Sequence, residues 1–152
     1  HSADTGAGAA LVSAAAPGGG LPTPPMDAAT GLPVGYPLRR DWEITPKELA
    51  GLLEQGLPDG AVLLDCRRDD EFAFNRLPGA VQIEMNQTEK RADELESPDG
   101  GRGHPVYVYC HHGRRSLQVA ATLRALGFRK AVSLAGGIDA WSMGIDPSVP
   151  RY

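Results

Sequence analysis

The sequence predicts an α/β domain with a mainly parallel sheet, and three observations carry this prediction. Short apolar runs that fit strands alternate with longer segments that carry the one-sided apolar pattern of helices. The run at 61–65 is apolar without alternation, which is typical of a strand buried on both faces of a parallel sheet. The chain has 152 residues, which suits one such domain.

The first elements have clear local signals. A helix is expected to begin at Pro46, because Thr45 can cap it and Glu48 can close a capping box. Leucines on one face continue this helix, and Gly56 ends it. The apolar strand at 61–65 follows.

The other elements are expected in alternation along the chain. They are a helix at 69–74, a strand at 80–83, a strand at 106–109, a helix from about 116 to 126, a strand at 131–134 and a last helix around 138–141. β-Branched and aromatic residues favour the strand at 106–109. The segment 87–103, between the strands expected at 80–83 and 106–109, is polar. Its run of charged residues at 89–94 fits a solvated helix face.

The N-terminal segment differs from the rest of the chain. Residues 1–35 are rich in Ala, Gly and Pro, so we expect them to be flexible and the folded domain to occupy residues 36–152. No Lys or Arg precedes Arg39, which fits neither a secretory signal nor a transit peptide, and a cytoplasmic location is expected.

Composition excludes several classes of protein. No apolar run approaches the ~18 residues of a membrane span, so no membrane partner is expected. The net charge of −4 excludes a generally basic nucleic-acid-binding protein, and no nucleic-acid partner is expected. The 2 cysteines cannot build a disulfide framework.

Cys110 is the candidate reactive residue. It follows the strand at 106–109 directly and precedes a helix, at the end of the sheet where α/β proteins bind ligands. A helix N-terminus offers unpaired N–H groups and partial positive charge, which lower the pKa of a thiol placed there. Gly113 permits backbone torsions that turn successive N–H groups inward. We therefore expect a nucleophilic thiolate.

The loop around Cys110 is basic. His111, His112 and Arg114 add positive character for an anionic substrate, and Arg115 is expected to orient the loop or the bound anion. A cradle of loop N–H groups around a thiolate can hold one extra sulfur atom as a persulfide. A metal ion on Cys110 and the two histidines is the alternative, but adjacent residues on a tight loop seldom converge on one ion, and we expect no metal and no cofactor.

Four segments, in the order of the chain, resemble motifs of the single-domain rhodanese family of sulfurtransferases. They are Leu64-Asp65-Cys66-Arg67, then Glu71-Phe72 with Leu77-Pro78-Gly79-Ala80, then the loop from Cys110 to Ser116, and last Leu134-Ala135-Gly136-Gly137-Ile138 with Ala140-Trp141. The resemblance covers nearly all of residues 42–144. It implies a three-layer, rhodanese-like domain with a five-stranded, mainly parallel sheet flanked by helices on both faces, the fifth strand lying near 42–44.

One further similarity and two differences accompany these motifs. The C-terminal segment 145–152 is similar to rhodanese modules that end sulfur-relay proteins. Asn75-Arg76 stands where the family often has Gly-His, and His111 stands where it often has Arg, which bears on substrate preference.

The resemblance implies a sulfurtransferase that moves sulfane sulfur through a Cys110 persulfide. The expected partners are a small anionic donor such as thiosulfate, which releases sulfite, and a thiol or protein acceptor. The persulfide cradle would consist of His111, His112, Gly113 and Arg114, with Arg115 also in a catalytic position. A protein-to-protein sulfur carrier and a non-enzymatic binding module, which commonly loses the cysteine, remain alternatives.

A phosphatase or arsenate reductase of the same fold is a less favoured alternative. Those enzymes carry a cysteine and an arginine separated by five residues. Here four residues separate Cys110 from Arg115, and Ser116 occupies the next position. The loop is therefore one residue too short for a tetrahedral oxyanion.

The other notable residues have structural interpretations. Cys66 ends a buried strand and is expected to be inert core, although a resolving thiol is conceivable there. Asp65 and Arg67 are expected to support the strand end, and Trp141 to pack in the core.

Overall fold

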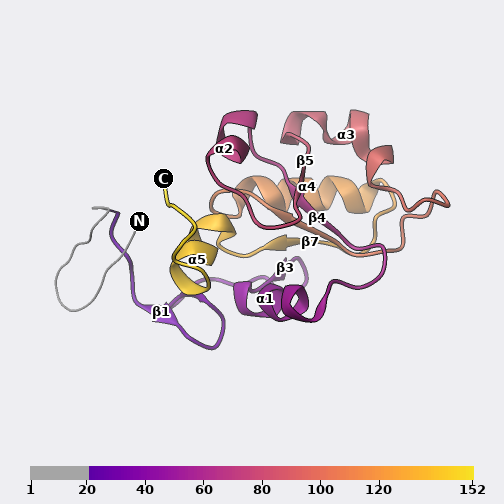
Figure 1. Cartoon of the computed structure of the whole chain (residues 1–152). Coiled ribbons are helices and arrows are strands. Elements are labelled where there is room, and N and C mark those ends of the chain that lie inside the picture. Colours follow the sequence, from indigo (N-terminus) through magenta and orange to yellow (C-terminus); the bar gives the residue numbers. More distant parts are fainter. Residues whose placement is uncertain (1–20) are drawn as a thin grey trace.

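The computed structural model describes residues 21–152 and contains a five-stranded parallel sheet with helices on both faces (Figure 1). Its strands are β3 (Glu43–Ile44), β4 (Val62–Asp65), β5 (Val81–Gln82), β6 (Val106–Tyr109) and β7 (Ala131–Leu134). They lie in the order β3-β7-β6-β4-β5, and every neighbouring pair is parallel. The predicted α/β fold is confirmed, and β3 is the expected fifth strand.

Helices cover the sheet as the alternating pattern predicts. They are α1 (Pro46–Gln55), α2 (Asp69–Phe74), α3 (Thr88–Arg91), α4 (Arg114–Ala125) and α5 (Gly137–Gly144). In Figure 1, α1 and α5 lie on one side of the sheet, and α3 and α4 lie on the other. Helix α4 begins at Arg114 rather than near Ser116, because Gly113 adopts a φ of 103° and serves as its N-cap.

Two hydrophobic clusters fill the space between the sheet and these helices. Successive strand residues point to opposite faces, so β4, β6 and β7 each contribute side chains to both clusters. Towards α4 the buried set includes Leu64, Cys66, Val106, Val108, Cys110, Val119, Ala120 and Leu123. Towards α1 and α5 it includes Leu49, Leu63, Tyr107, Tyr109, Leu134, Ile138 and Trp141. The core position predicted for Trp141 is confirmed.

A buried ion pair supports the end of β4. Asp65 and Arg67 both have side chains with no exposed surface, and the Nη2 and Oδ2 atoms are 2.7 Å apart. The Arg67 guanidinium also donates to the side-chain and backbone oxygens of Asn75, each at 2.7 Å. These bonds satisfy charges that would otherwise be costly to bury. The support expected from Asp65 and Arg67 is confirmed.

The ordered domain begins before residue 36, where the sequence predicts its start. Strands β1 (Met26–Asp27) and β2 (Leu32–Pro33) form an antiparallel pair. Leu32 is buried against Ala135 and Ala140. The sequence suggests an extended lead-in at 31–37 that packs along the domain surface, but its apolar residues show no periodicity that would single out Leu32. The predicted flexibility of residues 1–20 lies outside the described residues.

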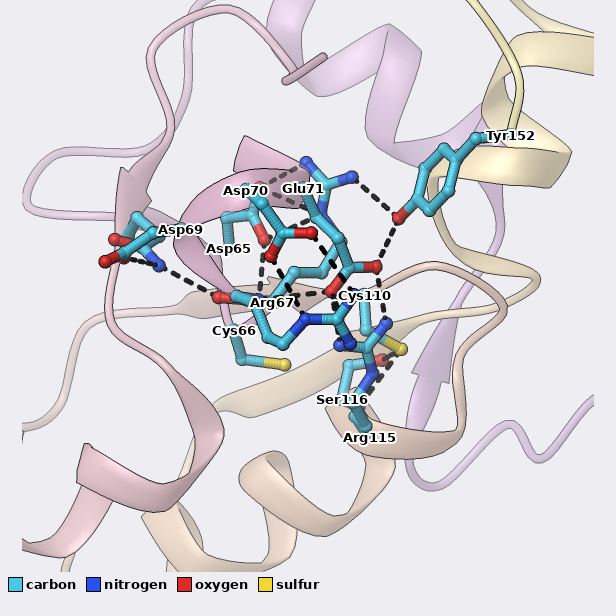
Figure 2. A network of polar contacts seen from close by, with 12 residues as sticks. Asp65, Cys66, Arg67, Asp69, Asp70, Glu71, Cys110, Arg115, Ser116 and Tyr152 are labelled. Atoms are coloured by element: carbon cyan, nitrogen blue, oxygen red, sulfur yellow. Dashed lines mark hydrogen bonds and ion pairs between the residues drawn. The ribbon is translucent and has the colours of Figure 1, made fainter. Parts of the chain in front are cut away.

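The C-terminal tail, residues 146–152, returns to the edge of the sheet where the C-terminal ends of β4 and β6 lie. The Asn75 side chain donates to the backbone oxygen of Pro150 at 2.7 Å. Arg151 forms an ion pair with Asp139 of α5 at 2.9 Å. These contacts bring Tyr152 beside α2 (Figure 2). No helix within residues 21–152 is both long and apolar enough to cross a bilayer.

The buried ion pair predicts a large effect on stability. Replacing Arg67 by Met leaves the Asp65 carboxylate buried without its counter-charge, so we expect unfolding free energy to fall by about 3–5 kcal/mol. Urea denaturation followed by circular dichroism measures this change. Arg68→Met is the matched control, because the Arg68 side chain is 64% exposed. Equal losses in the two variants would contradict the supporting role.

Candidate active site

Cys110 lies at the C-terminal end of β6, in the middle of the sheet, and α4 begins four residues later. The strand, the tight loop and the helix together aim the first turn of α4 at the cysteine (Figure 2). The Cys110 side chain is buried, with the whole residue only 1% exposed. The predicted location at the strand end is thus observed, and the sulfur there is covered by the protein.

Backbone N–H groups surround the Cys110 sulfur. Gly113 donates its N–H to Sγ at 3.1 Å, and Ser116 donates at 3.4 Å. The first N–H groups of a helix have no acceptor within the helix, so those of α4 are available for this purpose. The Ser116 hydroxyl lies 3.4 Å from Sγ and is itself bonded to the Ser133 hydroxyl at 2.7 Å. Ser116 and Ser133 were not among the predicted site residues.

These surroundings lower the pKa of the Cys110 thiol to about 5. The largest cause is the neighbouring Cys66 thiol; burial opposes the shift, and the bonds from Ser116 and Gly113 support it. The pKa of Cys66 is raised in turn, first by its bond to Cys110 and then by burial. Only Cys110 also receives two N–H groups, so the thiolate belongs on Cys110 and the proton on Cys66.

Cys66 therefore has a place in the site that the sequence pattern does not indicate. It is buried, as predicted, but it lies beside Cys110 because β4 and β6 are neighbours in register. Its S–H group donates to the Tyr109 carbonyl at 3.5 Å, and rotation of the thiol would turn this single proton towards Cys110 instead. The core position predicted for Cys66 is confirmed, and its place beside Cys110 adds an effect on the Cys110 pKa that the prediction did not include.

Helix α5 closes the loop from behind. The N–H of Ile138 donates to the Cys110 carbonyl at 2.9 Å, and the N–H of Asp139 donates to the His111 carbonyl at 3.0 Å. Gly137 makes this approach possible: a Cβ there would lie 2.4 Å from the His111 oxygen, and its φ is +62°. Gly137, the second of the paired glycines noted in the sequence, thus allows α5 to pack closely against the active loop.

Arg115 is bound to Glu71 of α2. Its Nη1 and Nη2 atoms lie 2.8 and 3.0 Å from the two carboxylate oxygens. This pair holds the pKa of Glu71 well below its usual range, with the Arg115 bond as the largest cause. Arg115 therefore braces the loop against α2, as Figure 2 shows. Glu71 was noticed only as part of a motif, and the structure gives it this partner.

Tyr152 covers the same region from the C-terminal tail. Its ring stacks on His111 with centroids 3.7 Å apart and planes at 7°. Its hydroxyl donates to Glu71 at 2.6 Å and accepts from Arg67 at 2.9 Å. Burial, together with the bond to Glu71, raises the pKa of Tyr152 to about 12. The residue lies far from the loop in sequence, and no local pattern predicts the contact.

The two histidines lie at the edge of the site rather than on the sulfur. Their rings lie 3.8 Å apart, and His112 is 3.6 Å from Asp139. Within the described part of the chain, the Nε2 of His111 is buried without a hydrogen-bond partner, and burial and His112 lower its pKa.

The ligand atoms of His111, His112 and Asp139 lie within 4.8 Å of one another. Arg151 already binds Asp139, and the His111 ring is stacked on Tyr152. The cluster also differs from the metal alternative weighed from the sequence, which needs Cys110. We assign its role to ordering the loop.

The remaining predicted residues take two positions. Gly113 is buried, and a side chain there would press on the Gly136 nitrogen at 3.2 Å and the Tyr36 hydroxyl at 3.4 Å. Arg114 is exposed, and the structure shows no ion pair for it within residues 21–152. The site thus contains the sulfur with its donors inside and a free cation at the rim.

The lowered pKa predicts how alkylation of Cys110 depends on pH. A thiol with a depressed pKa is already ionised at pH 7, so its iodoacetamide rate should stay level down to about pH 6 and fall through about pH 5. Cys66→Val removes a donor and should raise this midpoint by about one unit or more. Cys66→Ser keeps a donor and should stay near the wild type. Identical midpoints in all three proteins, mapped to Cys110 by mass spectrometry, would contradict the effect of the Cys66 thiol on the Cys110 pKa.

The stacked tail predicts that Tyr152 limits access to Cys110. We expect Tyr152→Ala to increase the alkylation rate at pH 7 several-fold, because His111 loses its cover. Tyr152→Phe keeps the ring and should retain most of the protection. Comparison of the two rates separates the ring from the hydroxyl, and a rate for Tyr152→Ala equal to the wild type would show that the tail does not restrict access.

Comparison with known proteins gives consistent matches. Residues 45–143 match the Rhodanese-like domain family. The thiosulfate sulfurtransferase GlpE of Haemophilus influenzae is 34% identical over 99 residues, which cover 65% of this chain and 86% of GlpE. The putative sulfur carrier protein YrkF of Bacillus subtilis is 36% identical over 80 residues, which cover 53% of this chain and 40% of YrkF.

Solved structures agree with this result. The crystal structure of a rhodanese-like domain protein from Staphylococcus aureus superposes with a TM-score of 0.59 at 28% identity, over 73% of this chain and 98% of that protein. YrkF is one of several curated relatives of which this chain spans less than half the length. The family match extends over more than half of the sequence, and the chain therefore belongs to the rhodanese-like domain family, which includes sulfurtransferases and sulfur carriers.

Proposed function

We propose that this protein is a sulfurtransferase that carries sulfane sulfur on Cys110 as a persulfide. The observation that carries the proposal is the pair of N–H groups, from Gly113 and Ser116, that point at the Cys110 sulfur. They favour a thiolate in a buried position, where a charge without such partners would be unstable. A buried, stabilised thiolate is a nucleophile protected from bulk water.

The first half-reaction loads the sulfur. The Cys110 thiolate attacks the outer sulfur of an anionic donor such as thiosulfate, the donor's S–S bond breaks, and sulfite leaves with the electron pair. Arg114, which is exposed at the rim, attracts the anion. The N–H groups of Arg114 and Arg115 belong to the first turn of α4 and have no acceptor within the helix, so they are available to the outer sulfur.

The second half-reaction delivers the sulfur. A thiolate or another thiophilic acceptor attacks the outer sulfur of the persulfide, and the Cys110 thiolate leaves. The two steps balance without a cofactor and predict ping-pong kinetics. Arg115 serves as a positioning residue, because Glu71 already holds its guanidinium and the pair fixes the loop.

The structure of the loop supports sulfur transfer over phosphoryl transfer. The position six residues after the cysteine, where an arginine would wrap a phosphate, holds Ser116. Ser116 is buried and contacts Sγ and the Ser133 hydroxyl. The pocket thus lacks a cation at the place that a tetrahedral oxyanion needs.

A protein acceptor is the second candidate. The closed pocket favours it, since Tyr152 lies over His111 and Cys110 is only 1% exposed. A docking protein that displaces the tail would open the site and receive the sulfur in one event. The name of YrkF, a putative sulfur carrier protein, is in keeping with this alternative.

Intact mass spectrometry after incubation with thiosulfate tests the proposal. The wild type should gain the mass of one sulfur atom, and cyanide or a thiol should remove it. Cys110→Ser should stay folded by circular dichroism and gain nothing, because a serine hydroxyl is not ionised at neutral pH. Sulfur gain by Cys110→Ser, or a wild type that stays unloaded with both thiosulfate and a persulfide donor, would overturn the assignment.

A further inference from the structure

We propose that Cys66 and Cys110 form a reversible disulfide when a peroxide oxidises Cys110, so that the site is also a redox-responsive dithiol. The inference uses the same cysteine as the proposed function but requires no sulfur donor. It assigns a chemical role to Cys66, a buried nucleophilic group that the transfer steps do not consume.

Strand register places the two cysteines side by side. Asp65 of β4 pairs with Tyr109 of β6 in the parallel ladder. One residue further, the Cys66 N–H donates to the Tyr109 carbonyl at 3.1 Å, so Cys66 and Cys110 form the next pair at the ends of neighbouring strands. Adjacent strands lie about 4.7–4.9 Å apart. Disulfides span Cα separations of about 4.4–6.8 Å, so the backbone spacing already suits a disulfide.

Both side chains point to the same face of the sheet. Cys66 and Cys110 belong to the core cluster on the α4 side, together with Leu64 and Val108, which lie two residues before them. In Figure 2 the Cys66 side chain extends towards the loop that carries Cys110. Both thiols are free, and the Cys66 sulfur is 3.5 Å from the Tyr109 carbonyl oxygen, next to Cys110 in the chain. Side-chain rotation is then the main movement that bond formation needs.

The two thiols differ in the way that such chemistry requires. Cys110 carries the thiolate, held by the N–H groups of Gly113 and Ser116, and is the group that a peroxide oxidises first. Cys66 keeps its proton and is equally buried, and we assign it the role of the resolving thiol. The sequence contains only these 2 cysteines, so a disulfide within one chain has one possible pairing.

The chemical steps balance with hydrogen peroxide as the oxidant. The Cys110 thiolate attacks one peroxide oxygen, the O–O bond breaks, hydroxide leaves, and Cys110 becomes a sulfenic acid. The Cys66 sulfur then attacks the Cys110 sulfur, the S–O bond breaks, and the Cys66 proton leaves with the hydroxyl group as water. A dithiol reductant returns both thiols. The disulfide blocks sulfur loading and spares Cys110 from irreversible oxidation to sulfinic acid.

The test treats the wild type, Cys66→Ser and Cys66→Val with hydrogen peroxide at pH 7 in the absence of any sulfur donor. We expect the wild-type monomer to lose the mass of two hydrogen atoms and to yield a linked peptide that contains both cysteines. Both variants should instead gain oxygen atoms on Cys110. After dithiothreitol, the wild type should regain all its thiosulfate loading, whereas the variants should remain well below their own untreated levels.

Several outcomes would overturn the inference. They are oxygen gain by the wild type without the linked peptide, disulfide-linked dimers in place of the internal bond, and full recovery of both Cys66 variants. Two Cys66 variants are used because one of them could fail to fold. Circular dichroism would reveal such a defect, and the other variant would then carry the test. Disulfide formation in a wild type that never loads sulfur would reject the proposed function and leave this inference standing.

Discussion

The site depends on the way the first turn of α4 meets the Cys110 sulfur. Gly113 and Ser116 donate backbone N–H groups to it, and they do so because Gly113 turns the chain into the helix with a φ of 103°. Behind the loop, α5 holds the carbonyls of Cys110 and His111, at a distance that only glycine at 137 permits. N–H groups thus face the sulfur while carbonyls face away, and this polarity favours the ionised form of the cysteine.

A second layer of charges fixes this loop relative to the sheet. Asp65, Arg67, Tyr152, Glu71 and Arg115 form one continuous chain of hydrogen bonds and ion pairs from the end of β4 to the start of α4. Each charged group in it has an opposite partner, which is the condition under which buried charges are tolerated. The chain explains why α2 and the C-terminal tail, which carry no reacting atom, lie at the site. It also leaves Arg114 as the loop arginine without an ion pair among the described residues, at the rim where a donor anion arrives.

Local patterns predict much of the fold and the location of the site, because their causes are local. The helix at 69–74, the strands at 106–109 and 131–134, and the capping box at Thr45 all appear as predicted. The position of Cys110 before a helix follows from the strand–loop–helix pattern alone.

Contacts between distant segments are beyond such patterns. Apolar runs do not specify that β4 lies next to β6 in register, so Cys66 looks like ordinary core until the sheet order is known. Leu32 and Tyr152 each reach the site region as one residue from a terminal segment, and one residue cannot produce a periodic signal. Nuclear magnetic resonance tests the central interaction most directly, by following the amide protons of Gly113 and Ser116 during a pH titration. Both signals should shift together at a pH well below the ordinary range of cysteine, and the shift should vanish in Cys110→Ser; signals that stay constant, or that move only near the ordinary cysteine pKa of about 8.5, would contradict the account.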